Sequence, residues 1–285
     1  MTRRQAVGWL ILVCLIWGAS FTVIKETLAL ISPLMLMGLK FGLAAMLLIG
    51  SFRGLSRYEL LGGMMLGLFF WGGMAFQTFG LDGTTPSRSA FITSPATPLV
   101  PVVFFLVYHR APHLLTIAGV ILAGIGMYLL ALPDAAGGGL NRGDLLTLGC
   151  AVMFAAHIVA AGHFSRRGAP TRLLAVELAT AGAMSFLLAP VLETPRLTPT
   201  LWFAAALTFM SLTGLWTFCV QLRAQQVLSP SHTALIFMLE PVFAALTSFI
   251  VLGERLAPLQ WGGAALILAA MALPALEPPP ALHSG

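Results

Sequence analysis

The sequence predicts an all-α membrane protein of ten transmembrane helices, arranged as two inverted five-helix repeats. Three observations lead to this prediction: an apolar composition, ten apolar stretches of helix length, and ordered matches between the two halves of the chain. Hydrophobic residues make up 58% of the 285 residues and charged residues only 9%, whereas soluble domains carry about 25% charged residues. The mean hydropathy of +0.93 indicates that most of the chain lies in a bilayer.

The length of the chain limits what else it can contain. Ten helices of about 20 residues use roughly 200 residues and leave roughly 85 for nine loops and two tails. The phosphate-binding loop of ATP-driven pumps needs a glycine-rich stretch that ends in lysine, and neither Lys25 nor Lys40 has that context. These observations exclude ATP-driven pumping by this chain alone and leave no room for a soluble catalytic domain.

Ten apolar stretches have the length that a transmembrane helix requires. They are residues 6–24, 33–52, 60–81, 86–107, 114–132, 143–164, 173–192, 201–220, 230–252 and 259–276. Transmembrane β-strands would be about ten residues long and would alternate apolar with polar residues. The first stretch is interpreted as a retained helix and not as a signal peptide, because it lacks a convincing small-residue cleavage site.

Basic residues in alternate loops predict the orientation of the chain. One side of the membrane carries nine of them: Arg3, Arg4, Arg53, Arg57, Arg110, Arg166, Arg167, Arg172 and Arg223. The other side carries five: Lys25, Arg88, Arg142, Arg196 and Arg255. Because basic residues favour the cytoplasmic side, we expect both termini in the cytoplasm of a cell with a bacterial-type inner membrane. The net charge of +5 is thereby interpreted as an orientation signal and not as a nucleic-acid surface.

The two halves of the chain match each other in the same order. Residues 86–92 resemble residues 230–236 at an offset of 144, which also pairs Gln77 with Gln221. Offsets of 136 and 137 pair Cys14 with Cys150, Pro33 with Pro170, and Lys40 with Glu177. Because five is an odd number, the second repeat enters the membrane from the opposite side, as in many secondary transporters. We expect repeats over residues 1–133 and 143–285, the second with a short C-terminal tail, joined by an external linker over residues 134–142.

Two short motifs resemble those of a known family. The motifs are Trp17-Gly18-Ala19-Ser20-Phe21, and Glu240-Pro241-Val242-Phe243 followed by Leu252-Gly253-Glu254-Arg255. Both are similar to EamA-type sequences of the drug/metabolite transporter (DMT) superfamily, and the resemblance covers nearly the whole chain as two EamA units. It implies a ten-helix exporter of small metabolites that works without ATP, in a family that includes amino-acid exporters of the YddG type. The chain departs from the family in the span over residues 33–52, where Lys40 replaces a frequent arginine.

Three ionisable side chains lie within the predicted spans, where a charge costs about 2.5–3.5 kcal/mol on insertion scales. Lys40 and Glu177 are repeat equivalents of opposite sign. They form a structural pair, hold separate partners, extend to water, or line a site for a zwitterionic substrate. Glu240 precedes Pro241, which is expected to kink its helix. Glu240 therefore either binds a proton or a substrate amine, or serves as a structural acid.

Other polar and aromatic positions complete the candidate site. Gln77 and Gln221 lie on matching faces that suit either helix packing or a cavity wall. Aromatic residues of the first span either wall a cavity or belong to the core, and His157 is a mid-span histidine that is expected to be able to exchange a proton. The predicted cavity residues are Trp17, Ser20, Phe21, Gln77, His157, Thr217, Gln221 and Glu240, and the intramembrane charges are Lys40, Glu177 and Glu240.

The leading hypothesis is a secondary transporter that exports small metabolites, amino acids or related compounds, by alternating access. The alternatives are a channel, a broad drug or metabolite efflux carrier, and an intramembrane enzyme. An enzyme would need clustered catalytic groups, and the sequence has neither a Gly-x-Ser-x-Gly nor a His-Glu-x-x-His motif. We expect no catalytic residue, no metal site and no cofactor. The expected partners are a small-molecule substrate and membrane lipid, with no nucleic acid, and the sequence leaves the oligomeric state open.

Overall fold

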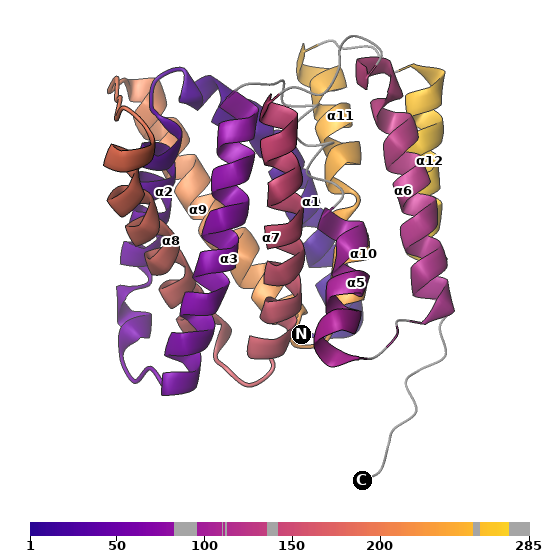
Figure 1. Cartoon of the computed structure of the whole chain (residues 1–285), viewed down its shortest axis with the longest axis horizontal. Coiled ribbons are helices and arrows are strands. Elements are labelled where there is room, and N and C mark those ends of the chain that lie inside the picture. The colour runs from indigo at the N-terminus through magenta and orange to yellow at the C-terminus, as the bar shows by residue number, and fades with distance from the viewer. Residues whose placement is uncertain (83–95, 110, 112, 136–141, 253–256, 274–285) are drawn as a thin grey trace.

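The computed structural model describes residues 1–82, 96–109, 111, 113–135, 142–252 and 257–273 (Figure 1). Within these residues the chain forms roughly parallel α-helices and one short 3-10 helix, η1. The first half contains α1 (Arg3–Leu28), α2 (Pro33–Leu47), η1 (Ile49–Phe52), α3 (Arg57–Asp82), α5 (Ala96–Tyr108) and α6 (Leu114–Ala135). The second half contains α7 (Arg142–Phe164), α8 (Pro170–Leu192), α9 (Leu201–Ala224), α10 (Pro230–Phe237), α11 (Glu240–Leu252) and α12 (Pro258–Ala272).

Helix lengths and surface composition both fit a bilayer. Helices α1, α3, α8 and α9 are long and apolar enough to cross a membrane by length and composition, and shorter apolar helices accompany them. Large apolar side chains lie on the outside of the bundle: Leu114 is 79% exposed, Val191 76% and Leu201 89%. An apolar exterior of this kind is suited to lipid and not to water.

Three boundaries differ from the sequence prediction. The second span is divided into α2 and η1. The α-helix ends at Leu47 and a 3-10 helix follows, because Gly50 is a poor α-helix former. The ninth span is divided into α10 and α11, because Pro241 has no N–H to continue the helical bonds from α10. Helix α6 extends into the predicted linker as far as Ala135, and residues 136–141 of that linker lie outside the described residues.

Most of the helix packing joins one half of the chain to the other. Helix α3 packs on α7 and α8, α2 on α8 and α9, and α1 on α9 and α11. Helix α5 packs on α7 and α10, and α6 packs on α12. Exchanging each helix for its repeat equivalent (α1 for α7, α2 for α8, α3 for α9, α5 for α11 and α6 for α12) returns these contacts, apart from that of α5 with α10. The sequence equivalent of α10, residues 86–92, lies outside the described residues. This is the pattern that a pseudo-twofold relation between the halves predicts.

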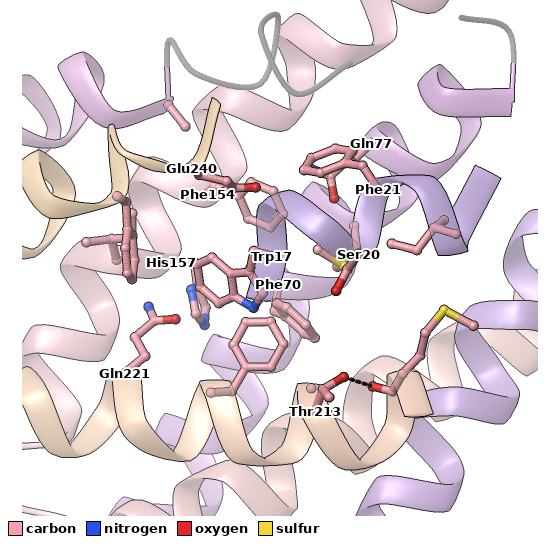
Figure 2. A pocket seen from close by; sticks show the side chains of 18 of the residues that line it. Trp17, Ser20, Phe21, Phe70, Gln77, Phe154, His157, Thr213, Gln221 and Glu240 are labelled. Atoms are coloured by element: carbon pink, nitrogen blue, oxygen red, sulfur yellow. Dashed lines mark hydrogen bonds between the residues drawn. The ribbon is translucent and has the colours of Figure 1, made fainter. Parts of the chain in front are cut away.

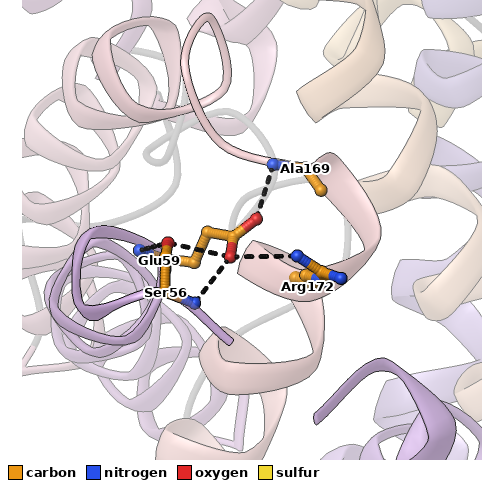
Figure 3. Close-up of polar contacts among 4 residues, drawn as sticks. All are labelled: Ser56, Glu59, Ala169 and Arg172. Carbon is orange, nitrogen blue, oxygen red and sulfur yellow. Dashed lines mark hydrogen bonds and ion pairs between the residues drawn. The ribbon is translucent and has the colours of Figure 1, made fainter. Parts of the chain in front are cut away.

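A glutamate from the first half is bound at the beginning of α8 (Figure 3). Glu59 Oε1 accepts a hydrogen bond from the backbone N–H of Ala169, the residue before α8, at 3.0 Å. Its Oε2 accepts from the backbone N–H of Ser56 at 2.9 Å and lies 3.4 Å from Nη1 of Arg172. A carboxylate at a helix N-terminus satisfies free N–H groups and interacts favourably with the helix dipole.

A glutamate from the second half makes the reciprocal contact at the beginning of α2. Glu193 Oε2 accepts from the backbone N–H of Leu34 at 2.9 Å, and Oε1 accepts from the N–H of Met35 at 3.0 Å. The hydroxyl of Ser32 also donates to Oε1, at 2.7 Å. Because α2 and α8 are repeat equivalents, Glu193 and Glu59 fix the two equivalent helix N-termini, each to the opposite half of the chain.

Candidate functional site

A cavity lies between the two halves, beside the break between α10 and α11 (Figure 2). Its volume is about 1050 Å³, which includes space open to solvent. Side chains of α1, α2, α3, α5, α7, α9, α10 and α11 line it. Both repeats therefore contribute to the cavity wall, as expected for a site at the interface of inverted repeats.

The cavity brings together most of the residues that the sequence analysis singled out. Seven predicted cavity residues line it: Trp17, Ser20, Phe21, Gln77, His157, Gln221 and Glu240. The eighth, Thr217, lies behind this wall and accepts a hydrogen bond from Nε1 of Trp17 at 3.0 Å. Of the intramembrane charges, Lys40 and Glu240 line the cavity. Glu177 does not line it and contacts Nε2 of the lining residue His157.

The first signature motif and the Glu240–Phe243 part of the second meet at the cavity, whereas Gly253, Glu254 and Arg255 lie outside the described residues. A β-carbon on Gly18 would lie 2.7 Å from the backbone N of Ala244 and 3.0 Å from the backbone O of Glu240. Only glycine therefore allows α1 to approach the first turns of α11 so closely. This contact places Trp17 and Glu240, from motifs more than 200 residues apart in the sequence, on the wall of the same cavity.

Two side chains of opposite charge line the cavity from different repeats. Lys40 of α2 is 6% exposed, and its Nζ lies 4.6 Å from the ring centroid of Phe41, a cation–π distance. Glu240 begins α11 and is partly exposed to the cavity. Among the described residues, neither side chain has an ion-pair partner. The pairing of Lys40 with Glu177, one of the structural alternatives, is absent.

Glu177 contacts a histidine instead. Its Oε1 lies 2.8 Å from Nε2 of His157, and the carboxylate is fully buried. The sequence offset relates Lys40 to Glu177, but Glu177 contacts His157 of α7, whereas Lys40 of α2 lines the cavity. Sequence offsets locate equivalent positions along two helices and do not say which third helix each side chain faces.

Aromatic rings form a continuous wall around the charged groups. The ring of Phe218 lies with its centroid 5.3 Å from that of Trp17 and 4.5 Å from that of Phe70. Phe70 in turn lies 4.9 Å from Phe41 and 5.6 Å from His157. Aromatic pairs at these separations are mutually favourable. They present a large apolar surface to whatever occupies the cavity.

Several of these lining residues were missed in the sequence although a signal was present. Phe70 and Met74 precede Gln77 by seven and three residues, so they share its face of α3. Gly214 and Phe218 precede Gln221 by the same spacings on α9. Extending the matched glutamine faces by two helical turns would have found them. Phe41, Phe154 and Phe237 also line the cavity, without a comparable signal.

The glutamine of α9 also ties the cavity wall to α7. Nε2 of Gln221 donates to Oε1 of Gln225 at 3.3 Å, and Nε2 of Gln225 donates to the backbone O of Ile158 at 2.8 Å. Gln77 is buried at the corresponding position of α3. Within the described residues, no group of three or more His, Cys, Asp or Glu side chains is arranged to hold a metal ion.

Comparison with known proteins identifies the family. The sequence model of the EamA-like transporter family matches residues 4–132 and 141–275. A protein of Archaeoglobus fulgidus named as an uncharacterized transporter is 35% identical over 279 residues, which cover 96% of this chain and 87% of that protein. A crystal structure of a protein shares the fold, with a TM-score of 0.76 at 19% identity over 96% of this chain and 99% of the other. The chain therefore belongs to the EamA-like transporter family of the DMT superfamily, and it is a membrane transporter of small molecules and not an enzyme.

Proposed function

We propose that the transporter exports amino acids or related zwitterionic metabolites across the inner membrane by alternating access. The observation that carries this proposal is the pair of opposite charges, Lys40 and Glu240, on an otherwise apolar and aromatic cavity wall. Charged side chains inside a membrane are costly and usually serve a pathway or a ligand. An α-amino acid carries both complementary charges next to an apolar side chain.

Each part of such a cargo has a counterpart in the cavity. The ammonium group binds the carboxylate of Glu240, and the carboxylate group binds the ammonium of Lys40. The cargo side chain lies against the rings of Trp17, Phe70 and Phe218, which favours large apolar side chains. Charge-assisted hydrogen bonds in a low-dielectric cavity are stronger than neutral ones, so this arrangement selects zwitterions over uncharged analogues.

The exchange of equivalent helices supports alternating access. In inverted-repeat transporters, the second state is generated when the two repeats exchange conformations around a fixed central site. The cavity borders the interruption between α10 and α11. The chain can bend at this point without breaking further backbone hydrogen bonds of a continuous helix. The repeats proposed for this motion are residues 1–133 and 143–285, with residues 134–142 as an external linker.

Counterflow tests the proposed function. Purified protein is reconstituted in liposomes loaded with one unlabelled amino acid at a time, and uptake of the same labelled amino acid is measured. We expect transient accumulation with amino acids that have large apolar side chains. Glu240→Gln keeps the volume of the side chain and removes its charge, so counterflow should fall about ten- to a hundredfold. Glu26→Gln, a change at an exposed residue of α1 outside the cavity, should leave it unchanged.

Two outcomes would contradict the proposal. A folded Glu240→Gln protein that exchanges amino acids at the wild-type rate over a range of pH would remove Glu240 from the site. Passage of the labelled compound without any counterflow would indicate a channel, because a channel has no exchange step.

Reporter fusions test the proposed orientation. Cytoplasmic and periplasmic reporters fused to each end should both indicate the cytoplasm, since the basic residues favour that side. A periplasmic reporter that is active at either terminus would reverse the assignment, and export would then have to be reassigned as uptake.

A further inference from the structure

The ionisable groups around the cavity differ in how they are held. Lys40 of α2 and Glu240 of α11 line the cavity without ion-pair partners among the described residues. His157 of α7 also lines it, and its Nε2 is bound to Glu177 of α8 at 2.8 Å. The described parts of α1, α3, α5, α9 and α10 contribute no ionisable side chain to the lining. His157 and Glu177 therefore form a separate unit that the proposed cargo contacts do not use.

Within the described residues, one side chain connects the carboxylate of this unit to the cavity. Glu177 is fully buried, and its Oε2 has no hydrogen-bond partner among the described residues. Helix α3 covers it closely, since a β-carbon on Gly67 would lie 2.8 Å from the backbone O of Glu177. The ring of His157 is the group that connects the buried carboxylate with the cavity. With Nε2–H donating to Glu177, the neutral ring leaves Nδ1 as the acceptor for a proton from cavity water.

We propose that the His157–Glu177 pair is a proton-binding site that controls closure of the cavity, so that the transporter changes state only when the pair holds one proton. This inference rests on the proposed alternating access. Without the proton, a neutral imidazole and a carboxylate carry one negative charge. A proton moved from cavity water to Nδ1 gives an imidazolium–carboxylate pair with no net charge, and the same proton returns to water when the cavity reopens.

Charge burial explains why closure depends on this proton. Closing the cavity removes water, and a net charge left in a dry, low-dielectric site is strongly disfavoured. The opposite charges of Lys40 and Glu240 compensate each other, and a zwitterionic cargo adds no net charge. The unprotonated pair is then the one uncompensated charge among the described cavity groups. Exchange should therefore become faster as the pH falls and the pair takes up its proton.

Two substitutions in the pair predict opposite results. Glu177→Gln removes the negative charge while the amide still accepts from Nε2–H, so closure no longer needs a proton. Counterflow in this variant should be as fast at pH 8 as in the wild type at pH 6. His157→Gln leaves the carboxylate without a proton carrier, so counterflow should be slower by about tenfold or more throughout. His163→Gln, an exposed histidine of the same helix bound to Tyr108, should keep the wild-type pH profile.

Counterflow measured from pH 5.5 to 8.5, with equal pH on both sides of the liposome, tests the proposal, and thermal unfolding checks that each variant is folded. The proposal is supported if the wild type exchanges faster at low pH, Glu177→Gln stays fast at high pH, and His157→Gln stays slow at every pH. A pH-independent wild type, or a Glu177→Gln profile equal to the wild type, overturns it. Loss of counterflow in both variants at every pH would show a structural pair and overturns it as well. Absence of counterflow in the wild type would instead refute the proposed function, and this inference with it.

Discussion

Helices α3 and α9 are repeat equivalents, yet they meet the opposite half of the chain in different ways. Helix α3 presents five glycines to α7 and α8: Gly62, Gly63, Gly67, Gly72 and Gly73. The residues at the offset of 144 on α9 are larger: Ala206, Leu207, Ser211, Trp216 and Thr217. A β-carbon on Gly67 would lie 2.6 Å from Cβ of Thr180, whereas one on Gly214 of α9 would have no neighbour within 4 Å.

The difference shows how closely each of the two helices approaches the opposite half of the chain. At one pair of equivalent positions, Gly73 leaves room for the ring of Phe154 from α7, while Thr217 accepts a hydrogen bond from the indole of Trp17 on α1. The glycine face lets α3 pack closely against the opposite half. The corresponding face of α9 contacts α1 through side chains and borders the cavity. The two repeats thus share one topology, but α3 packs on the opposite half through glycines where α9 carries larger side chains.

The largest expected effect on stability comes from adding one methyl group to a glycine, and it should differ between α3 and α9. Gly67→Ala forces α3 away from α8 and should lower the free energy of unfolding by about 1–3 kcal/mol. Gly214→Ala fills free space and improves helix propensity, so it should leave that free energy unchanged or raise it by up to about 1 kcal/mol. Thermal unfolding in detergent measures both. Equal losses in the two variants would show that the faces are packed alike.

The two helix-capping glutamates test the comparison at the ends of the bundle. Glu59→Gln and Glu193→Gln each turn an amide NH2 toward a backbone donor, so each should lower the stability by about 1–2 kcal/mol. Because both carboxylates hold equivalent helix N-termini, the two losses should be similar. Urea or thermal unfolding provides the measurement. A loss confined to one of them would mean that the equivalent contacts differ in strength.

A smaller effect is expected from the hydrogen bond between α9 and α1. Thr217→Val keeps the shape of the side chain but leaves Nε1 of Trp17 without its acceptor. The expected loss is about 0.5–1.5 kcal/mol in stability or in cargo binding. Thr208→Val, at an exposed residue whose hydroxyl donates to the backbone O of Ala204 in its own helix, is the matched control. Identical effects of the two changes on cargo KM would argue against a role of Trp17 in the cavity.

Much of the fold was predictable because the bilayer imposes length and composition on each helix. The all-helical membrane fold and the family are confirmed, since the apolar stretches and the motifs are local properties of the sequence. Pro241 predicted that the ninth span would be interrupted. The exact place of the break, after Phe237, depends on packing. The early end of α2 had only the weak signal of Gly50.

The site was predictable where repeat symmetry carried the information. The matched positions Gln77 and Gln221 predicted two walls of the cavity. Phe70 and Phe218 lie on the same two helix faces, but the sequence analysis did not extend those faces far enough to include them. The contact of His157 with Glu177 was not predictable, because it depends on how far α7 and α8 are rotated about their axes. Such rotations are set by three-dimensional packing, as by the glycines of α3, and periodicity in one helix does not record them.

Substrate protection of a cysteine on α9 tests most directly the central claim that cargo binds in this cavity. Thr213 lines the cavity, and Thr208 is exposed on the same helix; each hydroxyl donates to the carbonyl of the residue four positions earlier. Thr213→Cys and Thr208→Cys are made in a chain whose three native cysteines are replaced, and the rate of labelling by a small aqueous thiol reagent is measured with and without a transported amino acid. We expect Thr213→Cys to react and to be slowed by saturating cargo, while Thr208→Cys, facing lipid, stays inert in both conditions. Labelling of Thr213→Cys at the same rate with and without saturating cargo would contradict the account.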